Sequence, residues 1–571
     1  MARGTRILLA AAAALLVVSG YCWYRPANAP GVPATAPGGS LVGSIRSGPS
    51  NFLRYADRSG AAAAVSLLLD GRLVRLDRRT ETVEPGLAES WTLSDDGRTY
   101  TFRLREGVRF SDGAPFSSAD VLFSAQVLYD ERLMSTLGQA ITVDGQRLTF
   151  SAPDPRTVVV TLPARFAPGI RLFENLPIVP RHKLEAALAD GSIGQVWASG
   201  VAASQLAGLG PFILSSYRDG VHLAFARNPH YWRTAEDGTR LPYLDALTLQ
   251  ILPDQNSEAL RLIAGEIDFL TTSDPRPEDL GTLRRVEASS GALKVHDLGP
   301  TLDPDFLWFS TVPLPHTGGR PWLHERAFRQ AIAHAVDRQG MADGPYLGAA
   351  VPIHGPVTPG NTMWHSSEVP QYPLDRGRAR ELLASVGLTD SNGDGMLEDA
   401  AGAPARFSII VQSGHLRERA VTYIQDQLRQ SGLTVDIVAT DTNSMMGRWQ
   451  AKEYDAIYHY IPSSATDPAL MGQFWMSSGD FHLWNPNQPT PATPWETRID
   501  ELMRAQAKAP TLAERQALFA EVQKIIGEEL PALYFIASRV YVPVGRRVTN
   551  AKPAPQIPQL LWEADTLAVA R

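Results

Sequence analysis

A short segment carries oxygen-bearing side chains at the spacing of a calcium-binding loop: Asp390, Asn392 and Asp394. An EF-hand loop also needs a bidentate acid at its twelfth position, and that position is Ala401. Glu398 could supply one further oxygen at the ninth position. Because the decisive acid is missing, we interpret residues 390–399 as a turn and keep calcium binding as the alternative.

Residues with catalytic potential occur in the chain, but not at catalytic spacings. The twelve histidines are scattered, and no HExxH pair places two of them on one helix face. The sequence also lacks a G-x-S-x-G elbow, a P-loop and a G-x-G-x-x-G motif. Neighbouring acids such as Asp95 and Asp96 fall on a turn, where solvation explains them. We therefore predict no enzyme, no cofactor and no metal site.

The composition is typical of a globular protein, with 44% hydrophobic and 20% charged residues. A length of 571 residues predicts two or three domains. The net charge of -7 gives no electrostatic reason to bind nucleic acid. We expect a monomer with no nucleic-acid partner.

The N-terminal segment has the pattern of an export signal. Arg3 and Arg6 precede an apolar stretch at 7–18, and the small-x-small sequence at 27–29 is typical of a cleavage site. We therefore predict an exported protein, either periplasmic or tethered to the outer face of the cytoplasmic membrane.

The mode of attachment stays open. Residues 1–29 form a signal peptide or, because apolar character continues past residue 18, an N-terminal anchor. Cys22 is the single cysteine, but Tyr21 departs from the small residues that precede a lipidated cysteine. Residues 30–40 have the composition of a flexible tether.

One stretch predicts its own secondary structure in detail. Asp96 and Gly97 lie between two alternating runs, which begin at Trp91 and Tyr100, and this predicts a hairpin whose two turn residues have positive φ. Ser117 follows, and we expect it to cap a helix.

Periodic segments elsewhere predict an α/β protein. Helices are expected at 258–265, 326–337, 376–386, 417–431 and 511–528, and strands at 158–162, 221–225, 247–252, 267–270, 407–411 and 433–438. Two of these strands flank the helix at 417–431, which is an open α/β pattern.

Several segments resemble, in order, family 5 extracellular solute-binding proteins, the peptide/nickel-type receptors of ABC importers. They include VEPGLAESWTLSDDGRTYTFRLREGVRFSDGAPFSSADVLFS, GLGPFILSSYRDGVHLAFARNPHYW and LWFSTVPLPHTGGRPWLHERAFRQAIAHAVDR. The resemblance covers nearly everything after residue 40. It implies a receptor that captures a solute by hinge closure and delivers it to a membrane permease.

The resemblance also implies a two-lobed periplasmic-binding-protein fold, α/β (α+β) in class, with a hinge and an extra subdomain inserted in the first lobe. We expect the first lobe at 41–80, 206–300 and 536–571, the inserted subdomain at 81–205 and the second lobe at 301–535. The hairpin described above would belong to the insertion.

In peptide-binding members, an Asp three residues before an acid-Pro pair binds the α-ammonium group of the peptide. Here Asp467 and Pro468 form the pair, and Ser464 occupies the earlier position. A neutral hydroxyl does not replace a buried carboxylate opposite a desolvated cation. The family resemblance therefore predicts a receptor without this ammonium anchor.

The segment 454–488 is rich in aromatic and polar residues, which together suit a cleft wall. The expected ligand-binding residues are Tyr458, Tyr460, Ser464, Asp467, Trp475 and Trp484. We predict a peptide or peptide-like ligand held by its backbone. An oligosaccharide is the alternative, as is a metal chelate near His459 or His482, and a secreted hydrolase is the rival from another class.

Overall fold

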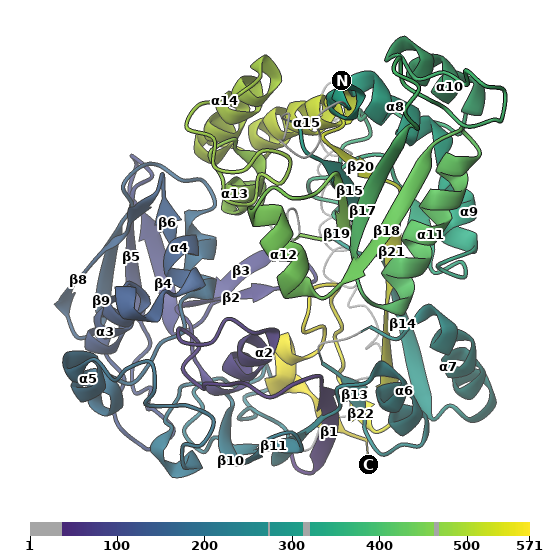
Figure 1. The fold of residues 1–571 in the computed structure, drawn as a ribbon. Helices are drawn as coiled ribbons and strands as arrows, with labels where there is room; N and C mark the ends of the chain where they lie inside the picture. The colour runs from purple at the N-terminus through teal and green to yellow at the C-terminus, as the bar shows by residue number, and fades with distance from the viewer. Residues whose placement is uncertain (1–36, 272–273, 312–319, 462–466, 571) are drawn as a thin grey trace, which may run out of the picture.

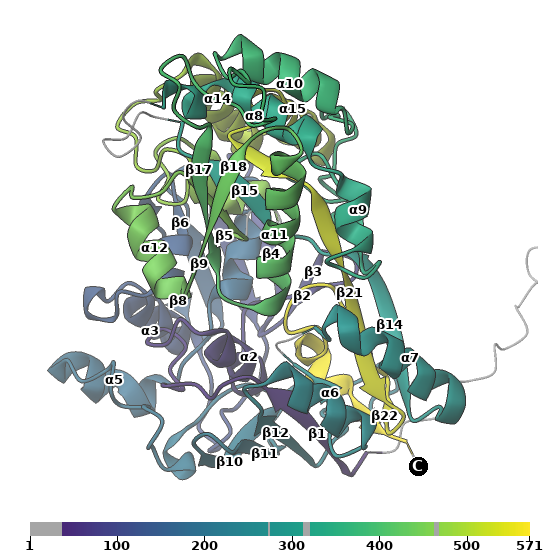
Figure 2. The same cartoon turned by 45° about the vertical axis from the view of Figure 1, so that its right-hand side comes forward.

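The computed structural model describes residues 37–271, 274–311, 320–461 and 467–570. Two lobes, each built around its own β-sheet, form the body of the protein, and a smaller sheet unit lies beside them (Figures 1 and 2). Within the described ranges, no helix combines the length and the apolar character needed to cross a membrane.

The first lobe contains an eight-stranded sheet drawn from distant parts of the chain. Its order is β10 (Phe212–Arg218), β11 (His222–Arg227), β12 (Ala246–Ile251), β1 (Ser40–Ile45), β13 (Phe269–Leu270), β21 (Ile536–Gly545) and β14 (Leu293–Pro300), with β16 (Ala350–Pro352) beside β21. β1 lies parallel to β12 and β13, and its Leu41 and Ile45 are fully buried. Strands nearly 500 residues apart, β1 and β21, therefore lie in one sheet.

The helices of this lobe are α2 (Gly60–Leu69), α6 (Gln255–Ile263) and α7 (Pro277–Ser290). A two-stranded ribbon, β2 (Val74–Asp77) and β3 (Thr82–Pro85), projects from the lobe between the two larger bodies (Figure 1). The ribbon leads directly into the smaller sheet unit.

The smaller unit, which we call the insert, is built around a four-stranded antiparallel sheet. Its order is β4 (Ala88–Leu93), β5 (Thr99–Leu104), β9 (Thr157–Thr161) and β8 (Thr149–Asp154), and the same unit carries α3 (Ser118–Leu128), α4 (Thr136–Ala140), β6 (Thr142–Val143), β7 (Gln146–Arg147) and α5 (Arg181–Asp190). The predicted hairpin is confirmed as β4 and β5, and Ser117 caps α3 in a capping box with Asp120.

The turn of the hairpin differs from the prediction. Residues 94–98 form the loop, and only Gly97 has a positive φ, of 70°. The Asp96 carboxylate instead accepts hydrogen bonds from Ser94 Oγ at 2.6 Å and from the Arg98 amide at 3.0 Å. A longer loop with one left-handed residue therefore replaces the two-residue turn.

The second lobe contains a five-stranded sheet in the order β18 (Thr434–Thr440), β17 (Arg406–Gln412), β19 (Ala456–His459), β15 (Phe306–Phe309) and β20 (Ala532–Tyr534). β17 is parallel to both β18 and β19, and α11 (His415–Arg429) and α12 (Thr442–Gln450) make the crossovers. Residues 409–411 of β17 are almost fully buried, as expected for a strand covered on both faces.

The remaining helices of the second lobe are α8 (Arg326–Ala335), α9 (Arg338–Asp343), α10 (Arg376–Ser385), α13 (Gly472–Trp475), α14 (Pro494–Lys508) and α15 (Leu512–Glu529). The helix predicted at 326–337 ends two residues early, because Val336 is extended and Asp337 caps α9 by accepting a hydrogen bond from the Gly340 amide. Asp337 thus begins a new helix instead of ending the previous one.

The chain passes between the two lobes through consecutive strands. β14 of the first lobe is followed by β15 of the second, and β20 of the second is followed by β21 of the first. β21 is the long yellow strand that runs from one lobe to the other in Figure 2. Paired crossings of this kind are suited to hinge motion between lobes.

Candidate ligand-binding site

Three strand ends meet at one edge of the second-lobe sheet. β19 is antiparallel to β15 with Phe306 opposite His459, and parallel to β17 with Val411 opposite Tyr458. The carboxyl ends of β17 and β19 therefore lie beside the start of β15. Ligands of open α/β sheets bind outside the carboxyl ends of the strands, so we call this edge the cleft edge.

Arg417 is the central cation of the cleft edge. Its Nε donates to Asp305 Oδ1 at 2.8 Å, and its Nη1 donates to Gln412 Oε1 at 2.5 Å. The guanidinium lies 5.2 Å from the centre of the Tyr460 ring. Burial acts to lower the pKa of Arg417, but the Asp305 carboxylate outweighs it and the pKa is raised. The cleft edge thus presents a permanent, oriented pair of opposite charges.

His459 adds a neutral ring to the cleft edge. It is buried, and burial together with the nearby Arg417 charge lowers its pKa to about 4. Its Nδ1 is buried without a hydrogen-bond partner among the described residues. At neutral pH, His459 therefore carries no charge that would compete with Arg417.

Of the four predicted aromatic contact residues, Tyr460 alone is substantially exposed, at 41%; Tyr458, Trp475 and Trp484 are buried. Tyr458 packs in the core of the second lobe, and Trp475 and Trp484 belong to a neighbouring cluster around Phe474. The structure thus brings Tyr460 to the cleft edge and places the two tryptophans in the core. Their contact with a ligand stays a prediction.

The Asp467 carboxylate bonds to other residues of the protein. It caps the short 3-10 helix η6 (Pro468–Met471), accepts from the Ala469 amide at 3.0 Å, and forms an ion pair with Arg515 of α15. Ser464, the other polar residue of the prediction, lies outside the described residues.

The side chain of His482 also bonds to other residues of the protein. Its Nε2 lies 3.1 Å from Glu496 Oε1 and its Nδ1 lies 3.2 Å from the Phe474 carbonyl oxygen. Across the described ranges, no group of three or more His, Cys, Asp or Glu side chains could hold a metal ion. In the former calcium candidate, Asp390 accepts from the amides of Gly393 and Gly395, as the turn interpretation expects.

Sequence reasoning missed Asp305, Gln412 and Arg417. A signal was available, because Gln412 directly follows the predicted strand at 407–411 and Arg417 begins the predicted helix at 417–431. Asp305 directly precedes β15, and its place beside that strand end depends on antiparallel pairing that the sequence alone did not predict.

The second lobe contacts both the first lobe and the insert. Arg419 of α11 lies 2.5 Å from Glu278 of α7, which connects the second lobe to the first. The Ala167 amide of the insert donates to the Ala507 carbonyl oxygen of α14 at 2.7 Å.

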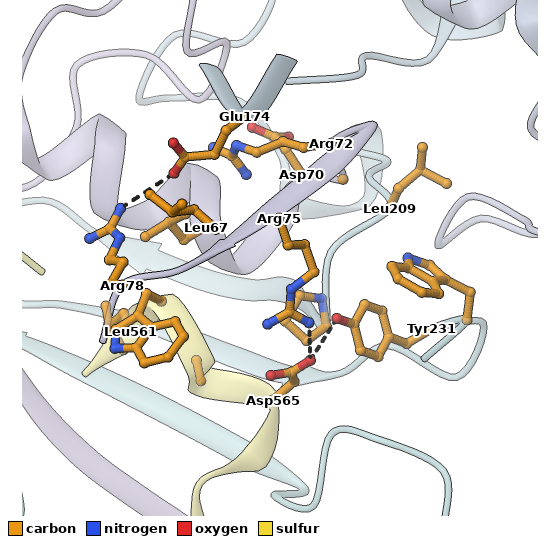
Figure 3. A pocket seen from close by; sticks show the side chains of 16 residues that line it. Leu67, Asp70, Arg72, Arg75, Arg78, Glu174, Leu209, Tyr231, Leu561 and Asp565 are labelled. Atoms are coloured by element: carbon orange, nitrogen blue, oxygen red, sulfur yellow. Dashed lines mark hydrogen bonds and ion pairs between the residues drawn. The ribbon is translucent and has the colours of Figure 1, made fainter. Parts of the chain in front are cut away.

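The first lobe contains a small charged cavity of about 70 Å³ near α2 and β2 (Figure 3). Arg75 pairs there with Asp565 at 3.3 Å, Tyr231 donates to the same carboxylate at 2.7 Å, and Arg78 lies 4.0 Å from Glu174. The volume holds a few water molecules but not a solute. These contacts tie the C-terminal segment to β2, so we interpret the cavity as structural.

The family model that matches this chain is one of binding proteins, and two of its individual relatives are binding proteins too. Residues 82–482 match the family model of bacterial extracellular solute-binding proteins, family 5. A probable ABC transporter-binding protein of Deinococcus radiodurans is 25% identical over 520 residues, which cover 87% of this chain and 86% of that protein. A dipeptide-binding protein of Pseudomonas aeruginosa is 26% identical over 522 residues, covering 86% and 88%.

Solved structures share the fold. The oligopeptide-binding protein AppA of Bacillus subtilis, in complex with a nonapeptide, has a TM-score of 0.73 at 21% identity and covers 94% of this chain and 100% of its own. The periplasmic binding protein MelB of Agrobacterium fabrum, in complex with stachyose, has a TM-score of 0.75 at 21% identity, covering 94% and 85%.

Proposed function

The chain belongs to the bacterial extracellular solute-binding proteins of family 5, and from this premise we propose that it is the peptide-binding receptor of an ABC importer. The observation that carries the proposal is the oriented Arg417 and Asp305 pair beside the exposed Tyr460 ring. A peptide backbone alternates donors and acceptors, so a fixed pair of opposite charges complements it. The dipeptide-binding relative supports this ligand class.

An oligosaccharide receptor is the second candidate. The exposed Tyr460 ring favours it, because sugar rings stack on aromatic faces, and a relative of similar identity is a periplasmic alpha-galactoside-binding protein. A metal-chelate receptor is less favoured, since His482 is bonded within the fold. We further propose that the protein catalyses no reaction.

The proposed lobes are 41–80, 206–300 and 536–571 for the first and 301–535 for the second, with the insert at 81–205. The shared eight-stranded sheet supports joining the three segments of the first lobe. We expect a monomer, exported by its N-terminal segment and tethered or periplasmic, that closes on its solute and presents it to a membrane permease.

The proposal predicts that the protein binds peptides and does not hydrolyse them. Native mass spectrometry of undenatured protein should detect retained solute, and pools of synthetic peptides should raise the thermal midpoint while stachyose does not. Arg417→Gln should weaken peptide binding about tenfold, since it removes a charged hydrogen-bond donor. Arg406→Gln is the matched control, because Arg406 pairs with Asp436 at the opposite end of β17. Peptide hydrolysis, or binding of stachyose alone, would contradict the proposal.

A further inference from the structure

A second cavity, with a volume of about 100 Å³, adjoins the charged cavity of Figure 3. The two cavities share four lining residues, which are Leu67, Arg72, Arg78 and Glu174. The other walls of the second cavity come from the first lobe, the insert and the C-terminal residues 557–558. None of the described residues that line it belongs to the second lobe, so it is separate from the cleft between the lobes. We call it the arginine cavity.

Three guanidinium groups line the arginine cavity, those of Arg54, Arg72 and Arg78. Glu174 is the one acid among the described lining residues, and it lies 4.0 Å from Arg78. Within the described part of the chain, neither Arg54 nor Arg72 has a carboxylate within 4.0 Å. The lining of the arginine cavity therefore carries more positive than negative charge.

The acceptors that the protein offers to these arginines are neutral. Arg72 donates to the Ser66 hydroxyl at 2.9 Å, and Arg78 donates to the Ile557 carbonyl oxygen at 3.1 Å. Arg54 donates to a backbone carbonyl oxygen as well. Each guanidinium has five N–H donors, so these contacts use only part of the donors that surround the cavity.

The three positive charges act on one another. Burial lowers the pKa of Arg54 and of Arg78, and the charge of Arg72 acts in the same direction on both. Asp57 and Asp70 oppose the effect on Arg54, but neither lies at ion-pair distance from it. Arginine stays protonated in proteins, so the repulsion persists at neutral pH. An anion in the cavity would relieve it.

We propose that the arginine cavity binds one tetrahedral oxyanion, either inorganic phosphate or sulfate. Guanidinium groups bind such ions through paired, charge-assisted hydrogen bonds. The volume of about 100 Å³ is well below the roughly 300 Å³ at which pockets for larger organic ligands begin, so it suits the free ion and not a phosphate ester. The ion connects the first lobe, the insert and the C-terminal segment, and it stabilises their contact whether or not a peptide is bound.

Calorimetry with inorganic phosphate and with sulfate tests the proposal on the whole chain, at one ionic strength maintained with sodium chloride. We expect the wild type to bind both ions and to unfold at a higher temperature in their presence. Arg72→Gln and Arg78→Gln should each weaken phosphate binding about tenfold, because each removes charged donors. Arg79→Gln is the matched control, since Arg79 is the exposed neighbour of Arg78.

The failure of this inference is distinguishable from the failure of the proposed function. No heat of binding with either ion, or equal affinity in the wild type and in both variants, overturns the anion site and leaves the receptor proposal standing. Binding of glycerol 3-phosphate as tightly as inorganic phosphate would show that the free ion is the wrong ligand. Competition between phosphate and the peptide pools would place the anion in the cleft and also overturn the inference, whereas independent binding supports it.

Discussion

Asp467 and Arg515 form a buried ion pair that connects the start of η6 to helix α15. Arg515 also donates to the Gln506 carbonyl oxygen at 3.1 Å and lies 5.1 Å from the centre of the Trp364 ring. The Asp467 charge is therefore already matched inside the protein. The carboxylate therefore fixes the start of η6.

Asp467→Asn should lower the free energy of unfolding by about 3 kcal/mol, because it leaves the buried Arg515 without its counter-charge. Urea unfolding at neutral pH measures this directly. Asp480→Asn, on an exposed loop residue of the same region, is the control and should change stability by less than about 0.5 kcal/mol. A loss for Asp467→Asn no larger than that of the control would show that the pair contributes little.

Blocking the N-terminus of a bound peptide should change its affinity by less than about threefold, or roughly 0.6 kcal/mol. Ser464 occupies the position at which the family resemblance implies an ammonium-binding Asp, and Asp467 is paired with Arg515. Calorimetry with free-amine and N-acetyl forms of one peptide checks this. Ser464→Asp should create a preference for the free amine. A hundredfold loss on acetylation in the wild type would mean that another carboxylate binds the ammonium.

Asp70→Asn should stabilise the protein at pH 7 by roughly 2 kcal/mol and not at pH 4. Burial raises the pKa of Asp70 to about 6, against the opposing effects of Arg72 and of the Ser66 hydroxyl. The folded state therefore binds an extra proton between about pH 4 and 6, and stability from this group falls as pH rises through that window. Thermal unfolding across pH measures the difference. Equal stabilisation at both pH values, or by exposed Asp95→Asn, would contradict it.

Glu278→Gln should shift the ligand-free protein toward a more open form, because it removes the contact between α7 and Arg419 of α11. Both side chains are partly exposed, so the pair contributes at most about 1 kcal/mol, a change of about fivefold in population. Small-angle scattering should show a larger radius of gyration without ligand and the wild-type value with it. Asp426→Asn, which removes a pair within α11, should leave the radius unchanged.

Local patterns predicted much of the fold. The hairpin of β4 and β5 and the capping box at Ser117 depend on neighbours in the sequence, and both were confirmed. The predicted end of α8 was wrong because Val336 is extended and Asp337 caps α9. Asp is favoured at the N-cap of a helix, but the apolar periodicity that predicted 326–337 does not show that a second helix begins there.

The candidate site was harder to predict. Aromatic residues near Tyr458 indicated the right region, but Trp475 and Trp484 pack in the core, and composition does not distinguish a core ring from a cleft ring. Arg417 and Asp305 lie 112 residues apart in the chain and meet only because β15 and β17 flank β19. Such a pair follows from strand order, which no local pattern contains.

The position of β21 has a consequence for the order in which the protein can fold. β21 begins at Ile536 of a 571-residue chain, yet it lies between β13 and β14, which are synthesised hundreds of residues earlier. Until it arrives, both of those strands expose unpaired edges, which other chains can pair with. The large sheet is therefore completed last, after nearly the whole chain has emerged. A nascent or truncated chain would depend on chaperones to protect those edges from aggregation.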